Sequence, residues 1–380
     1  MRAAQNTHDT KTTKTDARHM QHALHLARRA LGRAAPNPAV GCVLVRDGYV
    51  VGRGWTQPGG RPHAEIDALT EAGRAARGSC AYVTLEPCAH WGESGPCADA
   101  LVKAGVARVV YAAPDRDARV QGRGAARLKA AGVAVRVGVE RAAAEHLQRG
   151  FFLRLSGERP LFTAKLATSR AGASVSRTRW ITGEAARRCG HGLRAEHDAI
   201  LVGRRTLEHD RPQLTCRLPG MEAASPRPIV LDTQLRLSPR LGFWRHKRPQ
   251  RALVCHGPDA SPARRRAFMR LGVELISCPL AQAGPLEKTG GLEVRALARA
   301  LAAQGLTRVL LEGGAQTLRS FLAAGLVDDV AWFRSLQGKG VLAPMRRVFP
   351  SPRGTSWQMT RTLALGEDEG RFYTKAARTR

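Results

Sequence analysis

The sequence contains no apolar run approaching the roughly 18 residues that a membrane-spanning helix needs. Its first residues are polar and include Asp9 and Asp16, so they have neither the apolar centre of a secretion signal nor the acid-poor character of a transit peptide. We therefore expect a cytoplasmic protein that begins with a disordered tail over residues 1–18.

Aromatic and acidic residues are also scarce. Aromatics make up 5% of the chain, and 31 acidic residues stand against 61 basic ones, of which 52 are Arg, so the formal net charge is +30. The basic residues form no long tail, and few aromatics remain for the stacking platforms that hold single-stranded nucleic acids. We interpret the charge as helpful for phosphate-bearing substrates, with nucleic-acid binding as the alternative.

The eight cysteines are irregularly spaced, which is not typical of a disulfide framework and suits a reducing compartment. A length of 380 residues predicts two domains, with three as the alternative, and a hydrophobic content of 43% is ordinary for a soluble protein. The Gly-x-Gly-x-x-Gly fingerprint of dinucleotide-binding folds is absent.

Three residues between positions 63 and 97 form a candidate metal site. His63 is followed by Glu65 two residues later, and Cys88 and Cys97 each follow a proline. One imidazole and two thiolates suit zinc, and three protein ligands leave a fourth position open for water. Zinc lowers the pKa of that water, and Glu65 is chemically suited to move its proton. This pattern is typical of zinc-dependent nucleobase deaminases.

Two observations leave other interpretations open. Eight residues separate the two candidate cysteines, where the usual deaminase pattern has two. Structural zinc normally has a fourth protein ligand, and spacing alone leaves His90 available for that role. Because the three candidate ligands occur together with Glu65, we favour the catalytic interpretation. The other two cysteines of this half, Cys42 and Cys80, lie in apolar stretches and are interpreted as small buried hydrophobic residues.

Strands and helices alternate through the first half, which predicts a sheet layered between helices. Helices are expected over residues 18–31, 63–76, 96–103, 124–131 and 140–150, and strands over 40–45, 49–52, 81–85, 106–112 and 133–137. Asn37 lies between two prolines just before the first strand, where a turn residue can face a pocket. Residues 158–160 are interpreted as a linker.

The second half repeats this alternation. Helices are expected over residues 183–195, 262–271, 294–304 and 316–324, and strands over 161–167, 199–202, 228–231, 252–255, 273–276, 308–311 and 329–333. The run Leu311-Glu312-Gly313-Gly314 takes a strand through a glycine-rich turn into a helix, an arrangement that favours anion binding.

These residues resemble a known family, the bifunctional riboflavin-biosynthesis enzymes that join diaminohydroxyphosphoribosylaminopyrimidine deaminase to 5-amino-6-(5-phosphoribosylamino)uracil reductase. The first-half resemblance is carried by residues 36–42, 62–65, 82–92 and 96–101, and the long cysteine spacing is typical of this family. The resemblance implies a cytidine-deaminase-like α/β/α domain over 19–150. Its zinc ligands are His63, Cys88 and Cys97, its proton shuttle is Glu65, and its pocket residues are Asn37 and His90.

The second half resembles the reductase of that family, which implies a dihydrofolate-reductase-like α/β domain over 160–378. Its matching positions are Lys165, 178–182, 193–195, 202–203, Thr206, Asp210, 214–217, 232–233 and 311–314. The implied NADPH contacts are Ala167, Trp180, Thr206, Asp210, Thr233 and Gly314. The implied substrate contacts are Lys165, Thr178, Arg194, Leu214, Arg217 and Glu312.

The resemblance thus implies zinc-dependent deamination of 2,5-diamino-6-(ribosylamino)-4(3H)-pyrimidinone 5′-phosphate, followed by NADPH-dependent reduction of its ribosyl group to ribityl. We expect a homo-oligomer with no membrane or nucleic-acid partner.

Three stretches depart from the family pattern. Ser169-Arg170-Ala171-Gly172 lacks the usual acid, Asp210-Arg211-Pro212 replaces Asp-Asp-Pro, and residues 334–338 replace an Ala-Pro-Lys-like stretch. A second hypothesis therefore keeps the deaminase but makes the C-terminal half structural, and a third is a nucleic-acid base deaminase.

Overall fold

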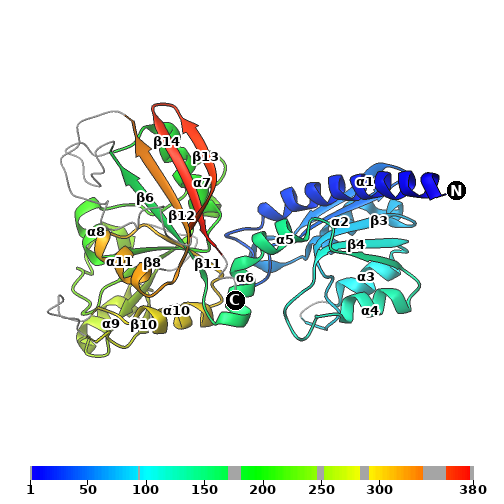
Figure 1. The fold of residues 1–380 in the computed structure, drawn as a ribbon. Helices are drawn as coiled ribbons and strands as arrows, with labels where there is room; N and C mark the ends of the chain where they lie inside the picture. Colours follow the sequence, from blue (N-terminus) through cyan, green and yellow to red (C-terminus); the bar gives the residue numbers. More distant parts are fainter. Residues whose placement is uncertain are drawn as a thin grey trace. The chain divides into compact units, whose positions relative to one another are not determined.

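The computed structural model describes residues 2–92, 95–169, 181–245, 252–282, 291–336 and 357–376, with side chains described from Lys14 onward (Figure 1). The chain divides into two compact units, Met1–Gly157 and Glu158–Arg380. No helix among these residues is long and apolar enough to cross a membrane.

The N-terminal unit has an α/β composition. Its helices are α1 (Arg2–Arg28), α2 (Ala64–Ala72), α3 (Cys97–Lys103), α4 (Arg123–Ala130), α5 (Arg141–Leu147) and α6 (Arg149–Gly157), with short 3-10 helices η1 (Pro58–Gly60) and η2 (Gly73–Ala76). Its strands are β1 (Gly41–Arg46), β2 (Tyr49–Trp55), β3 (Cys80–Leu85), β4 (Arg108–Ala113) and β5 (Ala134–Val137).

These five strands form one sheet in the order β2-β1-β3-β4-β5, in which β1 is antiparallel to both neighbours and β3, β4 and β5 are parallel. Glycines let helices approach both faces. A Cβ at Gly41 would lie 2.0 Å from the Ala23 carbonyl of α1, whereas one at Gly54 would lie 2.2 Å from the Ala64 carbonyl of α2. Since Gly54 pairs with Cys42, the neighbour of Gly41, the two helices cover opposite faces. The predicted α/β/α layering is confirmed.

The N-terminal tail expected over residues 1–18 is helical in the structure, because α1 begins at Arg2 and includes Asp16. The Asp16 side chain is only 1% exposed and accepts hydrogen bonds from Tyr82, Arg108 and Arg136. These partners follow Asp16 by more than 60 residues, so sequence patterning near the terminus gave no sign of them. The single helix expected over 140–150 is instead divided into α5 and α6.

The C-terminal unit is also α/β. Its helices are α7 (Glu184–Ala195), α8 (Arg204–Asp210), α9 (Pro262–Arg270), α10 (Val294–Ala303) and α11 (Ala315–Ala323), with 3-10 helices η3 (Glu222–Ala224) and η4 (Gly242–Arg245). Its strands are β6 (Leu161–Thr168), β7 (Ala199–Gly203), β8 (Arg227–Leu231), β9 (Leu253–His256), β10 (Glu274–Ser277), β11 (Arg308–Leu311), β12 (Val327–Ser335), β13 (Trp357–Leu365) and β14 (Asp368–Lys375).

One nine-stranded sheet runs in the order β10-β9-β8-β7-β11-β6-β12-β14-β13. The strands from β10 to β12 are parallel, and β14 and β13 add an antiparallel hairpin that is visible beside β12 in Figure 1. In parallel sheets, ligands bind beyond the carboxyl ends of the strands. That edge carries the segments after β7, β8 and β11, in which most of the predicted reductase residues lie.

Candidate active sites

The three predicted zinc ligands meet in the N-terminal unit. His63 immediately precedes α2, Cys88 lies in the turn after β3, and Cys97 is the first residue of α3. Their possible ligand atoms all lie within 4.8 Å of one another. His63 Nδ1 is 3.3 Å from Cys97 Sγ and 3.8 Å from Cys88 Sγ. One nitrogen and two sulfurs at such distances fit a single zinc ion.

The turn between Cys88 and Cys97 is held by backbone hydrogen bonds at the start of α3. The Cys97 amide donates to the Cys88 sulfur at 3.3 Å, and the Ala98 amide donates to the Cys88 carbonyl at 3.1 Å. Hydrogen bonds with the Cys97 thiol and the His63 ring outweigh burial and lower the pKa of Cys88 to about 4. Cys88 is thus held as a thiolate, the form that binds metals.

Glu65 lies in the first turn of α2, and its side chain faces the interior. The residue is 4% exposed, and its carboxyl group hydrogen-bonds with the Cys97 thiol. Burial, reinforced by the Cys88 thiolate, raises the pKa of Glu65 to about 7. A carboxyl group with this pKa can both accept and release a proton near neutral pH.

In the C-terminal unit, three predicted substrate residues lie together at the carboxyl end of the sheet. Arg194 of α7 forms an ion pair with Glu312, which directly follows β11, at 2.9 and 3.0 Å. Lys165 Nζ of β6 lies 3.9 Å from Glu312 Oε2. Burial alone would raise the pKa of Glu312, but Arg194 and Lys165 outweigh it and lower that pKa to about 2. Glu312 is therefore an anion throughout the neutral range.

Arg194 also connects this ion pair to the segment 214–217. Its Nη1, the guanidinium nitrogen that does not pair with Glu312, donates to the Thr215 carbonyl at 2.9 Å. Leu214 is buried with a φ of +56°, and Arg217 is exposed and donates from its side chain to Gln213 at 3.1 Å. The hydrogen bond to Thr215 therefore holds the segment that contains Leu214 and Arg217 close to the Arg194–Glu312 ion pair.

A cavity of about 910 Å³ lies beyond the ends of β7, β8 and β11, and three predicted cofactor residues, Thr206, Thr233 and Gly314, line it. Its volume is within the range of small-molecule sites. Gly314 precedes α11, whose start has no side-chain cap, so its first amides suit a phosphate group. These features fit a dinucleotide cofactor.

Comparisons with known proteins cover both units. Residues 13–113 match the family model of the cytidine and deoxycytidylate deaminase zinc-binding region, and residues 165–334 match the RibD C-terminal domain. The riboflavin biosynthesis protein RibD of Escherichia coli is 37% identical over 329 residues, covering 83% of this chain and 86% of the relative. That of Aquifex aeolicus is 34% identical over 86% of this chain and 89% of the relative. The chain belongs to the RibD family.

Solved structures agree with this membership. RibD of Acinetobacter baumannii, in its form 1, has a TM-score of 0.80 at 33% identity, covering 96% of this chain and 100% of that one. A Thermotoga maritima deaminase/reductase has the same TM-score at 27% identity, covering 96% and 100%. This RibD-family chain is therefore a bifunctional deaminase and reductase of riboflavin biosynthesis with a zinc-binding domain and an NADPH-dependent domain. The two alternative hypotheses, a structural C-terminal half and a nucleic-acid base deaminase, are not favoured.

The remaining predicted residues of this RibD-family chain have varied positions. Asn37 donates to the Gly60 carbonyl at 3.0 Å, near the segment that leads to His63. The buried Nδ1 of His90 has no hydrogen-bond partner within the described residues. Ala167 pairs with Phe333 in the sheet, and Asp210 is the exposed last residue of α8. Thr178 and Trp180, like Ala171 and Gln337 of the divergent stretches, lie outside the described residues.

Sequence reasoning missed Glu86, which holds the turn that carries Cys88. The Glu86 side chain is buried and accepts from the amides of Gly122 and Ala125 at 3.1 and 3.2 Å, at the start of α4. A Cβ at Gly124 would lie 2.0 Å from the Pro87 carbonyl, so glycine is required there. The Gly122-x-Gly124 pair was the available signal, although it did not reveal its partner.

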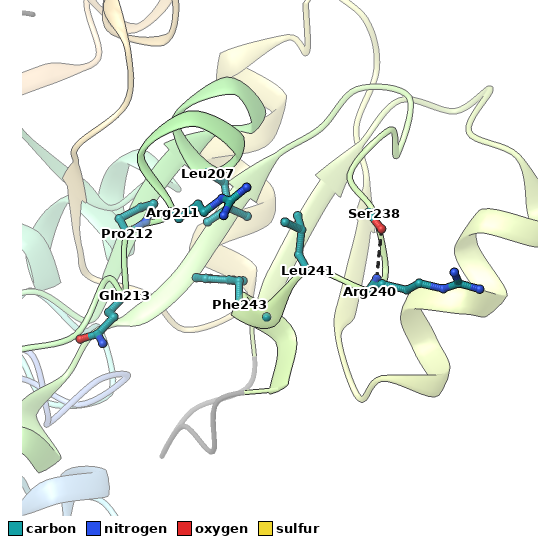
Figure 2. A pocket seen from close by; sticks show the side chains of 9 residues that line it. Leu207, Arg211, Pro212, Gln213, Ser238, Arg240, Leu241 and Phe243 are labelled. Atoms are coloured by element: carbon teal, nitrogen blue, oxygen red, sulfur yellow. Dashed lines mark hydrogen bonds between the residues drawn. The ribbon is translucent and has the colours of Figure 1, made fainter.

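A smaller cavity of about 460 Å³ lies at the end of α8, where Leu207 and Arg211 lie near Leu241 and Phe243 (Figure 2). None of the predicted site residues that the structure describes lines it. Arg211, which replaces the acid usual in the family, has a φ of +42° and is exposed. This cavity is separate from the one that carries Thr206.

Proposed function

We propose that a deaminase domain over residues 19–150 acts on 2,5-diamino-6-(ribosylamino)-4(3H)-pyrimidinone 5′-phosphate and replaces its 2-amino group by oxygen, releasing ammonia. A reductase domain over residues 160–378 then converts the ribosyl group of the product to ribityl with NADPH. The observation that carries the first step is the meeting of His63, Cys88 and Cys97 beside the buried Glu65.

His63, Cys88 and Cys97 hold the zinc ion in this proposal. Bound there, zinc supplies the Lewis acidity that lowers the pKa of a water molecule. The Glu65 carboxylate accepts the proton of the attacking water and passes it to the departing amino nitrogen. Asn37 and the otherwise unpartnered Nδ1 of His90 offer polar contacts to the substrate.

In the reductase, the cofactor binds in the cavity lined by Thr206, Thr233 and Gly314. Its further contacts in this proposal are Ala167, Trp180 and Asp210. NADPH supplies the hydride. Lys165, Thr178, Leu214 and Arg217 contact the phosphorylated sugar. Arg194 and Glu312 contact the substrate as well, and the Glu312 carboxylate positions both Arg194 and Lys165, since it pairs with both.

Arg217 tests the reductase assignment, because its exposed guanidinium is suited to a phosphate group. Arg217→Ala should raise the KM for the deaminated phosphate substrate and abolish most NADPH oxidation, measured by the loss of nicotinamide absorbance. Arg270→Ala, which removes an exposed arginine from the end of α9, is the matched control and should behave as wild type. Unchanged kinetics in Arg217→Ala would remove Arg217 from the substrate site.

Three further expectations belong to this proposal. The protein is a homo-oligomer, which sedimentation at several concentrations tests. It functions in the cytoplasm, which cell fractionation tests. It does not use nucleic acid as a substrate despite its charge of +30, and titration with single-stranded DNA at several salt concentrations tests this.

A further inference from the structure

The cavity that carries Thr206, Thr233 and Gly314 has a strongly basic lining. Four arginines contribute to it, namely Arg204, Arg205, Arg236 and Arg319. Asp232 is the only acidic residue among the described residues that line it. Such a lining favours a ligand with several negative charges, as a phosphorylated dinucleotide has.

The four arginines are not equivalent. Arg204 is already compensated, because its guanidinium pairs with Glu208 at 2.7 Å and lies 4.0 Å from the Asp232 carboxylate. Within the described parts of the chain, Arg205, Arg236 and Arg319 form no ion pair, and all three are exposed. Three positive charges are thus available to a ligand in this cavity.

Arg236 belongs to a loop whose conformation is fixed before any ligand binds. The loop follows β8 and begins at Asp232, whose side chain is 2% exposed and accepts from the Leu237 amide at 2.8 Å. The Leu235 amide donates to the Asp232 carbonyl at 2.9 Å, and Leu235 has a φ of +52°. The next strand also holds the loop, since the Gly257 amide donates to the Thr233 carbonyl at 2.8 Å.

The order of the strands sets the direction of a bound dinucleotide. Lys165 of β6 lies 3.9 Å from Glu312, which directly follows β11, so the reacting nicotinamide belongs on that side. The uncapped start of α11 at Gly314 suits the pyrophosphate. Since β7 and then β8 follow β11 in the sheet, the adenosine half extends toward the loop after β8.

We propose that Arg236, with the hydroxyl of Thr233, binds the 2′-phosphate of the adenosine ribose and thereby selects NADPH over NADH. The inference rests on the proposed reductase function. A guanidinium group can donate two hydrogen bonds to one phosphate, and NADH has no group at that position. In this proposal Arg319, which lines the same cavity from α11, contacts a phosphate that both cofactors share.

The test is direct binding of NADPH and of NADH to the full-length protein, followed by nicotinamide fluorescence and without turnover. Arg236→Ala should weaken NADPH binding about tenfold or more and leave NADH binding unchanged. Arg236→Lys should recover part of the loss, because a lysine keeps the positive charge but cannot donate two parallel hydrogen bonds to one phosphate. Arg319→Ala should weaken both cofactors equally, and Arg270→Ala should change neither.

Equal weakening of both cofactors in Arg236→Ala overturns the inference, because Arg236 then contacts a group that they share. Unchanged NADPH binding in Arg236→Ala also overturns it. A loss selective for NADPH in Arg205→Ala, and not in Arg236→Ala, would overturn it as well. Failure of the wild-type protein to bind NADPH is a different result, since it contradicts the proposed reductase function itself.

Discussion

The guanidinium group of Arg194 and the carboxylate of Glu312 form a two-point ion pair, at 2.9 and 3.0 Å, although 118 residues separate them in the sequence. The pair joins α7 to the end of β11, and its two side chains are 13% and 11% exposed. Both residues were predicted to contact the substrate, and the structure shows that they also contact each other. The pair therefore positions its neighbours, since Glu312 also lies near Lys165 and Arg194 also hydrogen-bonds to the segment 214–217.

Glu312→Gln should destabilise the C-terminal unit in a pH-dependent way. The ordinary pKa of this carboxyl group is 4.5, and the native structure lowers it to about 2, so the charged form is favoured by folding. Its contribution is complete above pH 4.5 and is lost as the pH falls through about 2. Urea unfolding should show a loss on the order of 3 kcal/mol at pH 7 that shrinks between pH 4.5 and pH 3.

The conservative control is Glu369→Gln, which removes a carboxylate paired with Arg371 near the surface of the same unit. It should cost much less at pH 7. A Glu312→Gln variant as stable as wild type at pH 7 would show that the ion pair contributes no net stability.

Cys88→Ser should remove most of the zinc and the release of ammonia, because a hydroxyl is a poor replacement for a thiolate ligand. Cys80→Ser changes a half-buried cysteine of β3 that is outside the metal cluster and serves as the control. Elemental analysis should give one zinc per wild-type chain and per Cys80→Ser chain. Full metal content and activity in Cys88→Ser would refute the ligand assignment.

Glu65→Gln should retain zinc while deamination slows by a factor of about 10² to 10⁴, since an amide can neither accept the proton of water nor pass it on. Glu71→Gln makes the same chemical change on an exposed face of the α2 helix, where Glu71 pairs with Arg53. Ammonia release should distinguish the two variants. A rate within a few-fold of wild type in Glu65→Gln would show that Glu65 does not transfer the proton and is only an acidic residue in the first turn of α2.

Asp16→Ala should destabilise the N-terminal unit, because it leaves Arg108 and Arg136 without their shared carboxylate. Burial opposes the charge on Asp16, but hydrogen bonds from Arg108 and Tyr82 lower its pKa overall. We expect a cost of roughly 2 to 3 kcal/mol, below that of a fully buried pair because the two arginines are partly exposed. Thermal unfolding should show it, whereas Glu145→Ala, which removes a surface ion pair with Arg141 on α5, should have little effect.

Most of the layered α/β architecture could be predicted from sequence, because short apolar strands alternate with helices that end at a glycine, as α3 does at Gly105 and α4 at Gly132. The zinc cluster was predictable for a different reason, since its residue types and order reflect the chemistry of one ion. The helix α8 was missed because Arg204–Asp210 is short and polar. The hairpin of β13 and β14 was missed because the solvent-exposed residues of β13 show no apolar run.

Long-range polar partners were beyond prediction for a common reason. Asp16 with Arg108, Glu86 with the start of α4, and Arg194 with Glu312 are brought together by folding, and no local periodicity encodes such pairs. The contact of Asp16 holds the N-terminal helix. The contact of Glu86 supports the turn that carries Cys88, and that of Glu312 supports the candidate reductase site. The family resemblance identified residue types at the sites, and the structure added the residues that hold them.

The most direct test of the bifunctional assignment is to incubate the purified protein with 2,5-diamino-6-(ribosylamino)-4(3H)-pyrimidinone 5′-phosphate, with and without NADPH, and to identify the products by mass spectrometry. The account predicts ammonia and the deaminated ribosyl product without NADPH, and the ribityl product with stoichiometric NADPH oxidation when the cofactor is present. Deamination without any ribityl product would contradict the reductase half, and an unchanged substrate would contradict the account as a whole.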